Sequence, residues 1–162
     1  MDRPRLRAVT KVDRIDGPFV WAVERDAHVL ILHEAGSYHW LETWLDGHRT
    51  SLGDPLPGEM WLLPVDRANR AEARGGGVRF VEIEIPVSLL SVPRGARPIA
   101  AHQDRAMAEL VGAVAAGDAG AEGSLLARLS ITLAAGVTRP VPPAVAERID
   151  DLMAFIQARL EA

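Results

Sequence analysis

Residues 46–64, which read DGHRTSLGDPLPGEMWLLP, limit most strongly what this chain can fold into. Asp46-Gly47 is typical of a two-residue hairpin turn, because Asp and Gly tolerate the positive φ that such turns require. Residues 55–58 (PLPG) predict a second turn, since proline fixes φ and glycine takes the left-handed conformation freely. The apolar run at residues 60–63 follows, and flanking glycine and proline favour a strand buried on both faces.

Short apolar runs between turn residues continue this pattern. Residues 1–18 are expected to form an arm or a first edge strand. Gly36-Ser37 is expected to interrupt the run that begins at residue 28, and residues 75–77 (GGG) are expected to form a loop. Seven or eight short strands without an intervening helix predict a sandwich or barrel. The predicted strands that complete this set are residues 19–23, 28–33, 38–45, 48–52, 67–73 and 78–85.

Alternation is clearest in the run VRFVEIEI at residues 78–85. Val81, Ile83 and Ile85 share one face of the predicted strand with Arg79, and Glu82 lies on the other. We interpret the glutamates of this run as a solvated strand face rather than as acid–base groups.

The apolar period changes to that of a helix after Pro98. Met107, Leu110, Val111 and Val114 form one stripe at helical spacing, which must be buried against the strands or against a second subunit. Residues 117–123 are expected to form a flexible break before a second helix with Leu126, Leu129 and Leu133, ending near Gly136. Prolines at 140, 142 and 143 then separate a last helix over residues 144–160.

Composition excludes several classes of protein. The 162 residues include no cysteine, so disulfides and thiolate sites are excluded, and we expect a cytoplasmic location. No apolar run approaches the roughly 18 residues of a membrane span, and residues 1–10 lack the apolar segment of a signal peptide. A net charge of −4 argues against a large nucleic-acid surface on this chain.

Gly58-x5-Pro64 resembles the second conserved motif of the cupin family. The order of the predicted segments resembles the N-terminal region of AraC-type transcriptional regulators. The segments are a barrel, two helices, a proline-marked linker and a helix reading RIDDLMAFIQARL. This resemblance implies a mainly β fold with C-terminal α structure: a cupin-like β-barrel (double-stranded β-helix) followed by two or three helices. Residues 1–98 would be the sensor barrel with its arm, residues 99–139 the dimerisation segment, and residues 140–162 a linker and the first helix of a helix-turn-helix domain.

The same resemblance implies the partners. A small-molecule effector would bind in the barrel, and a homodimer would form through the stripe of Met107, Leu110, Val111 and Val114. The recognition helices are not in this sequence, so DNA would be bound only through a C-terminal domain that this chain lacks.

Metal and nucleophile motifs are missing. Metal-binding cupins are similar to one another in a His-x-His element, which this sequence lacks, and the histidine position of their second motif falls on Asn69. There is also no Gly-x-Ser-x-Gly elbow. We therefore expect no metal, no cofactor and no enzyme activity.

Aromatic residues between 38 and 61 suggest a ligand pocket, although core packing is the alternative. The candidate ligand-binding residues are Tyr38, Trp44, Trp61, Asn69 and Arg79. The sequence leaves open whether Arg79 lies at a rim, pairs with a carboxylate or meets an anionic or hydroxylated ligand. It also leaves open which face of residues 39–45 points inward.

The preferred hypothesis is the ligand-sensing and dimerisation region of an AraC-type regulator. A free-standing small cupin enzyme with a weakly held metal and a ligand-free dimerisation module are the alternatives.

Overall fold

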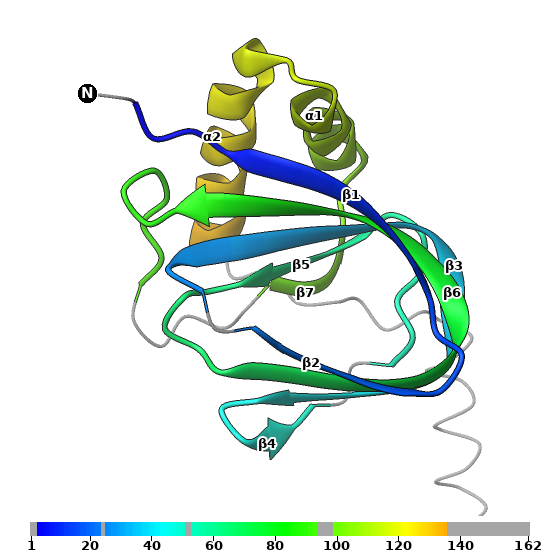
Figure 1. The fold of residues 1–162 in the computed structure, drawn as a ribbon. Helices are drawn as coiled ribbons and strands as arrows, with labels where there is room; N and C mark the ends of the chain where they lie inside the picture. The colour runs from blue at the N-terminus through cyan, green and yellow to red at the C-terminus, as the bar shows by residue number, and fades with distance from the viewer. Residues whose placement is uncertain (1–2, 24, 51–52, 94–98, 136–162) are drawn as a thin grey trace, which may run out of the picture.

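A computed structural model describes residues 3–23, 25–50, 53–93 and 99–135 (Figure 1). The described part of the chain is mainly β, with two helices after the strands, as the sequence predicts. Its elements are β1 (Arg7–Arg14), β2 (Pro18–Val23), β3 (Ala27–Leu45), β4 (His48–Arg49), β5 (Glu59–Leu63), β6 (Asn69–Pro86), β7 (Ile99–Gln103), α1 (Arg105–Ala115) and α2 (Ala119–Ala135). The predicted helix over residues 144–160 lies outside the described residues.

The seven strands of the described ranges form one open antiparallel sheet. The strand order is β1-β6-β3-β5-β7, and in addition β2 pairs with β6 and β4 with β3. β3 and β6 are 19 and 18 residues long and pair along almost their whole length. β1 and β5 pair with one end of these long strands, and β2 and β4 pair with the other end. The sheet therefore has two halves: one contains β1, β5 and β7, and the other contains β2 and β4. Figure 1 shows β3 and β6 bending so that one half lies over the other.

Glycines allow this bend. Two predictions about them are wrong, because both glycine segments lie inside strands. β3 continues through Gly36 after a register shift between His33 and Ala35, and β6 continues through the three glycines that were expected to form a loop. Gly36 and Gly76 have φ values of +87° and +105°, and a Cβ on Gly36 would lie 2.0 Å from the backbone oxygen of Gly77. The two backbones approach too closely for any side chain, so the strands bend here instead of ending.

The two turns of residues 46–64 are confirmed. Asp46 and Gly47 have φ values of 49° and 78°, and they join β3 to β4. The second turn covers residues 56–59, one residue later than predicted. Its Glu59 N–H donates to the carbonyl of Leu56 over 3.0 Å, and Gly58 has a φ of 88°. All five residues of β5 are buried, as expected of a strand covered on both faces.

The main core lies between the helices and the β1–β7 half of the sheet. It joins Leu30 and Ile83 of the sheet to Val111 of α1 and Leu125 of α2. β7 was not predicted; it pairs with β5 and brings the start of residues 99–139 into the sheet. None of the described helices is long and apolar enough to cross a membrane.

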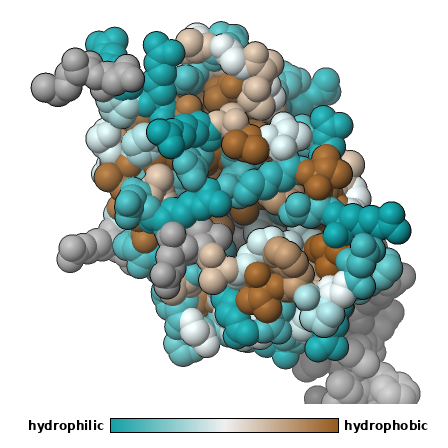
Figure 2. Space-filling view, in the orientation of Figure 1, coloured by the Kyte–Doolittle hydropathy of each residue, from teal (hydrophilic) through white to brown (hydrophobic). Residues whose placement is uncertain are grey.

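The helices differ in detail from the prediction. α2 already begins at Ala119, so the break before it is shorter than expected, with Gly117 at φ 90° making the turn. Of the predicted α2 stripe only Leu129 is buried, and Leu126 and Leu133 are partly buried beside it. On the face of the molecule seen in Figure 2, hydrophobic side chains lie in small groups separated by hydrophilic ones.

Candidate ligand-binding cavity

A cavity of about 70 Å³ lies between the two halves of the sheet. Its wall is mostly apolar and aromatic and includes a few polar side chains, as is usual for small-molecule sites. The lining residues come from β2, β3, β5 and β6: Trp21, Ile31, His33, Tyr38, Leu41, Trp61, Leu63, Asn69, Ala71, Phe80 and Glu82.

Strand alternation explains which side chains reach this cavity. Ile31 of β3 pairs with Trp61 of β5 on one side and with Glu82 of β6 on the other, so these three side chains share one face of the sheet. Their neighbours Leu30 and Leu62 belong to the core beneath the helices. The parts of β3, β5 and β6 that pair here are therefore covered on both faces.

His33 and Trp61 are the most distinctive polar groups of the cavity. Their exposed fractions are 6% and 7%, and their ring centroids lie 5.0 Å apart in an edge-to-face arrangement. Neither His33 Nε2 nor Trp61 Nε1 has a hydrogen-bond partner among the described residues. Burial lowers the pKa of His33 to about 4, so its imidazole is neutral near pH 7. Buried polar atoms normally have a partner, so these two nitrogens mark a place where a ligand group would fit.

Glu82 corrects the interpretation of its strand face as solvated. The residue is only 9% exposed, because the other half of the sheet covers this face. Its two oxygens accept from Lys11 Nζ at 3.1 Å and from Arg25 Nη1 at 2.5 Å, and Arg25 also binds Glu84 at 2.5 Å. The two cations neutralise the buried carboxylate and tie β1 and the residues after β2 to β6.

Three of the predicted ligand-binding residues, Tyr38, Trp61 and Asn69, do line the cavity. Burial, with smaller contributions from Asp13 and Asp54, raises the pKa of the Tyr38 phenol above its ordinary value. The ring of Tyr38 also contacts that of Trp21 edge-on, with centroids 5.8 Å apart.

Trp44 and Arg79, the other two, lie outside the cavity. Leu41 lines the cavity and Thr43 is buried, so alternation places Trp44 on the opposite face of β3, where the guanidinium of Arg70 lies 5.1 Å from its ring centre. Arg79 is exposed and binds Glu34 at 2.8 Å, which agrees with both the rim and the carboxylate pairing that the sequence left open.

The ligand-binding residues predicted from the sequence did not include His33, Trp21, Phe80 or Glu82. The pattern HVLILH did contain a signal for His33, because it places this histidine on the same strand face as Val29 and Ile31. A polar residue in phase with apolar ones faces a buried environment.

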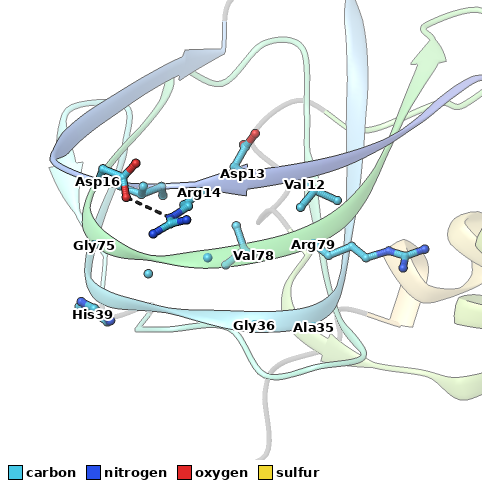
Figure 3. Close-up of a pocket in the computed structure, with 13 residues that line it drawn as sticks. Val12, Asp13, Arg14, Asp16, Ala35, Gly36, His39, Gly75, Val78 and Arg79 are labelled. Carbon is cyan, nitrogen blue, oxygen red and sulfur yellow. Dashed lines mark hydrogen bonds and ion pairs between the residues drawn. The ribbon is translucent and has the colours of Figure 1, made fainter.

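A second concavity lies outside the bend of the sheet and measures about 790 Å³ (Figure 3). It is an open groove with the three glycines of β6 in its wall, and Arg14 and Asp16 at its edge bind each other at 3.2 Å. Figure 3 shows the Arg79 side chain pointing away from it. The groove offers no buried polar group comparable to those of the inner cavity among its described lining residues.

In the part of the chain that the structure describes, no three His, Asp or Glu side chains gather as a metal site would require. Asn69, at the position of a metal-binding histidine in the resembled motif, provides an amide instead. The absence of a bound metal or cofactor stays a prediction.

The predicted dimerisation stripe mostly faces its own chain. Met107, Val111 and Val114 are buried in the core, and Leu110 is only partly buried. Val114, with 7% of its surface exposed, offers little to a second subunit, so the homodimer prediction now depends chiefly on Leu110.

Comparison of the sequence with family models and with curated proteins finds no match.

Proposed function

We propose that this chain is the small-molecule-sensing and dimerisation region of an AraC-type transcriptional regulator, and that it is not an enzyme. The observation that carries the proposal is the cavity between the sheet halves, in which two buried nitrogens have no partner among the described residues. Such a cavity suits binding of an effector and contains no group of side chains arranged for catalysis among those described.

The finer architecture that we propose is a cupin-like barrel. Its support is the pair of sheet halves that lie across one cavity, together with the Gly58-x5-Pro64 element, whose apolar strand provides Trp61 to the cavity wall. The AraC-type assignment is supported by the order of the segments: strands first, then two helices packed on the sheet.

Signal transmission would work by population shift. Lys11 and Arg25, from the N-terminal part of the chain, both bind Glu82 in the cavity wall. A ligand that changes the position of Glu82 favours one arrangement of the N-terminal strands over another. DNA-binding domains tethered beyond residue 162 would respond to that arrangement.

A thermal-shift screen with a library of small metabolites tests the proposal. Ala71 lines the cavity, so Ala71→Leu fills part of it. Ala22→Leu makes the same chemical change at an exposed position of β2 and serves as the matched control. We expect at least one compound to raise the Tm of the unmodified chain and of Ala22→Leu but not of Ala71→Leu. The proposal fails if no compound stabilises the unmodified chain, or if every stabilising compound acts equally on both variants.

A further inference from the structure

We infer that the cavity takes a neutral, single-ring ligand carrying a hydroxyl group, that is, a small phenol or cyclic alcohol held by His33 and Trp61. This inference rests on the proposed sensing function, which it deepens by naming a ligand class.

A ligand group that can both donate and accept a hydrogen bond matches the two unpartnered nitrogens, His33 Nε2 and Trp61 Nε1. The indole N–H of Trp61 can only donate, so the ligand must offer it an acceptor. His33 is neutral, so one of its ring nitrogens carries a proton and the other accepts. A hydroxyl satisfies Trp61 as an acceptor and can serve His33 Nε2 in either tautomer. The two rings are 5.0 Å apart at their centres, so one small molecule meets both.

The charges around the cavity favour a neutral ligand. No Lys or Arg is among its described lining residues, and the only carboxylate there, that of Glu82, already binds Lys11 and Arg25. An anionic ligand would therefore lose its water without gaining a cation, because both neighbouring cations are already paired with Glu82. A cationic ligand would have to compete with two protein cations for Glu82.

The wall of the cavity favours a ring, and its size limits the ligand to one. A cavity of about 150 Å³ binds benzene, so a cavity of about 70 Å³ admits nothing larger than a single small ring. Trp21, Trp61 and Phe80 line the space, and aromatic side chains pack well edge-on or offset against a planar ring.

The test uses three probes: phenol, toluene of the same heavy-atom count, and benzoate as the anion. Binding is followed through the tryptophan indole N–H resonances in ¹H–¹⁵N spectra, with the Trp61 signal assigned from Trp61→Phe. Because one net hydrogen bond of about 1 kcal/mol changes binding about fivefold, we expect phenol to bind at least that much more tightly than toluene and to shift the Trp61 resonance. Benzoate is expected to bind more weakly than phenol.

Variants separate the hydrogen bonds from the shape of the cavity. His33→Phe keeps a planar ring but removes both nitrogens, so it should bring phenol affinity down toward that of toluene and leave toluene affinity unchanged. Trp61→Phe should have the same effect, and it provides the comparison if His33→Phe does not fold. Trp44→Phe, on the opposite face of β3, is the control and should bind phenol as the unmodified chain does.

The ligand class is overturned if toluene binds as tightly as phenol, if benzoate binds more tightly, or if none of the three probes binds. In each of these cases the sensing function still stands when the metabolite screen finds compounds that Ala71→Leu excludes. The sensing function is overturned only when the metabolite screen also finds no compound that Ala71→Leu excludes.

Discussion

Arg128 of α2 donates two hydrogen bonds to Asp104, the residue that caps the N-terminus of α1. Its Nε lies 2.6 Å from Oδ2, and its Nη2 lies 2.9 Å from Oδ1. The same Oδ1 accepts from the backbone N–H of Met107 over 3.1 Å. The hydrogen bonding from Arg128 is the largest cause of the lowered pKa of Asp104; burial, the next largest effect, opposes it, and the bond from Met107 lowers the pKa further. One carboxylate thus joins the start of the first helix to the second.

Asp104→Ala removes this junction, so we expect it to lower the free energy of unfolding by about 1 kcal/mol, within the usual range for a helix N-cap. Asp104→Asn keeps a capping oxygen and should lose less. The control is Arg105→Ala on the same helix turn, where an exposed pair with Glu109 contributes little. Urea unfolding at pH 7 measures all three. Equal stability of Asp104→Ala and Arg105→Ala would mean that the junction does not matter.

Acid should destabilise the protein through His33. Its pKa is about 4 in the folded state and near 6.5 in the unfolded chain, so the unfolded state takes up the proton first as the pH falls. This contribution to stability is fully present above pH 6.5 and is lost progressively between pH 6.5 and 4, by at most about 3 kcal/mol.

Denaturant unfolding across this pH range, compared between the unmodified chain and His33→Phe, isolates the effect because other groups titrate in both. The variant should lose less stability on acidification. His48→Phe, at an exposed position of β4, is the control and should follow the unmodified chain. Parallel curves for the unmodified chain and His33→Phe would contradict the prediction.

The bend of the sheet should not tolerate a side chain at Gly76. A Cβ there would lie 2.2 Å from the backbone oxygen of Ser37, and the φ of +105° is strained for any other residue. We therefore expect Gly76→Ala to cost more than about 2 kcal/mol. Gly17→Ala is the control, since a Cβ at Gly17 would meet nothing within 4 Å. Thermal unfolding of both variants gives the answer, and similar Tm values would refute this account of the bend.

What the sequence predicts well here is local. The turn at Asp46-Gly47 and the α1 stripe follow from the backbone preferences and periods of neighbouring residues, and the structure has both. The bend is different, because glycines 36 and 76 are needed where two distant strands approach each other, and a glycine in sequence looks the same in a loop and in a bent strand. β7 carries no strong strand signal, and its pairing with β5 depends on tertiary structure.

The cavity could be predicted only in part for the same reason. Trp61 was found in a cluster of aromatic residues and Asn69 through a motif, whereas Glu82 was assigned to solvent because its strand alternates polar and apolar residues. The two cations that make its burial possible, Lys11 and Arg25, lie far away in the sequence. Alternation shows that a strand has two different faces, and it does not show what covers each of them.

The proposed homodimer gives the last prediction. Leu110 is the one member of the α1 stripe that is only partly buried, while the adjacent Val111 has 0% of its surface exposed. In a two-fold contact the same residue of both subunits meets near the axis, so Leu110→Glu would bring two like charges together. We expect the unmodified chain to sediment as a dimer and Leu110→Glu as a folded monomer with a similar Tm. Val111→Glu is the contrasting variant and should unfold, because it buries an unpaired charge in the core. A monomeric unmodified chain at high concentration, or a Leu110→Glu variant that stays dimeric, would show that α1 is not the contact.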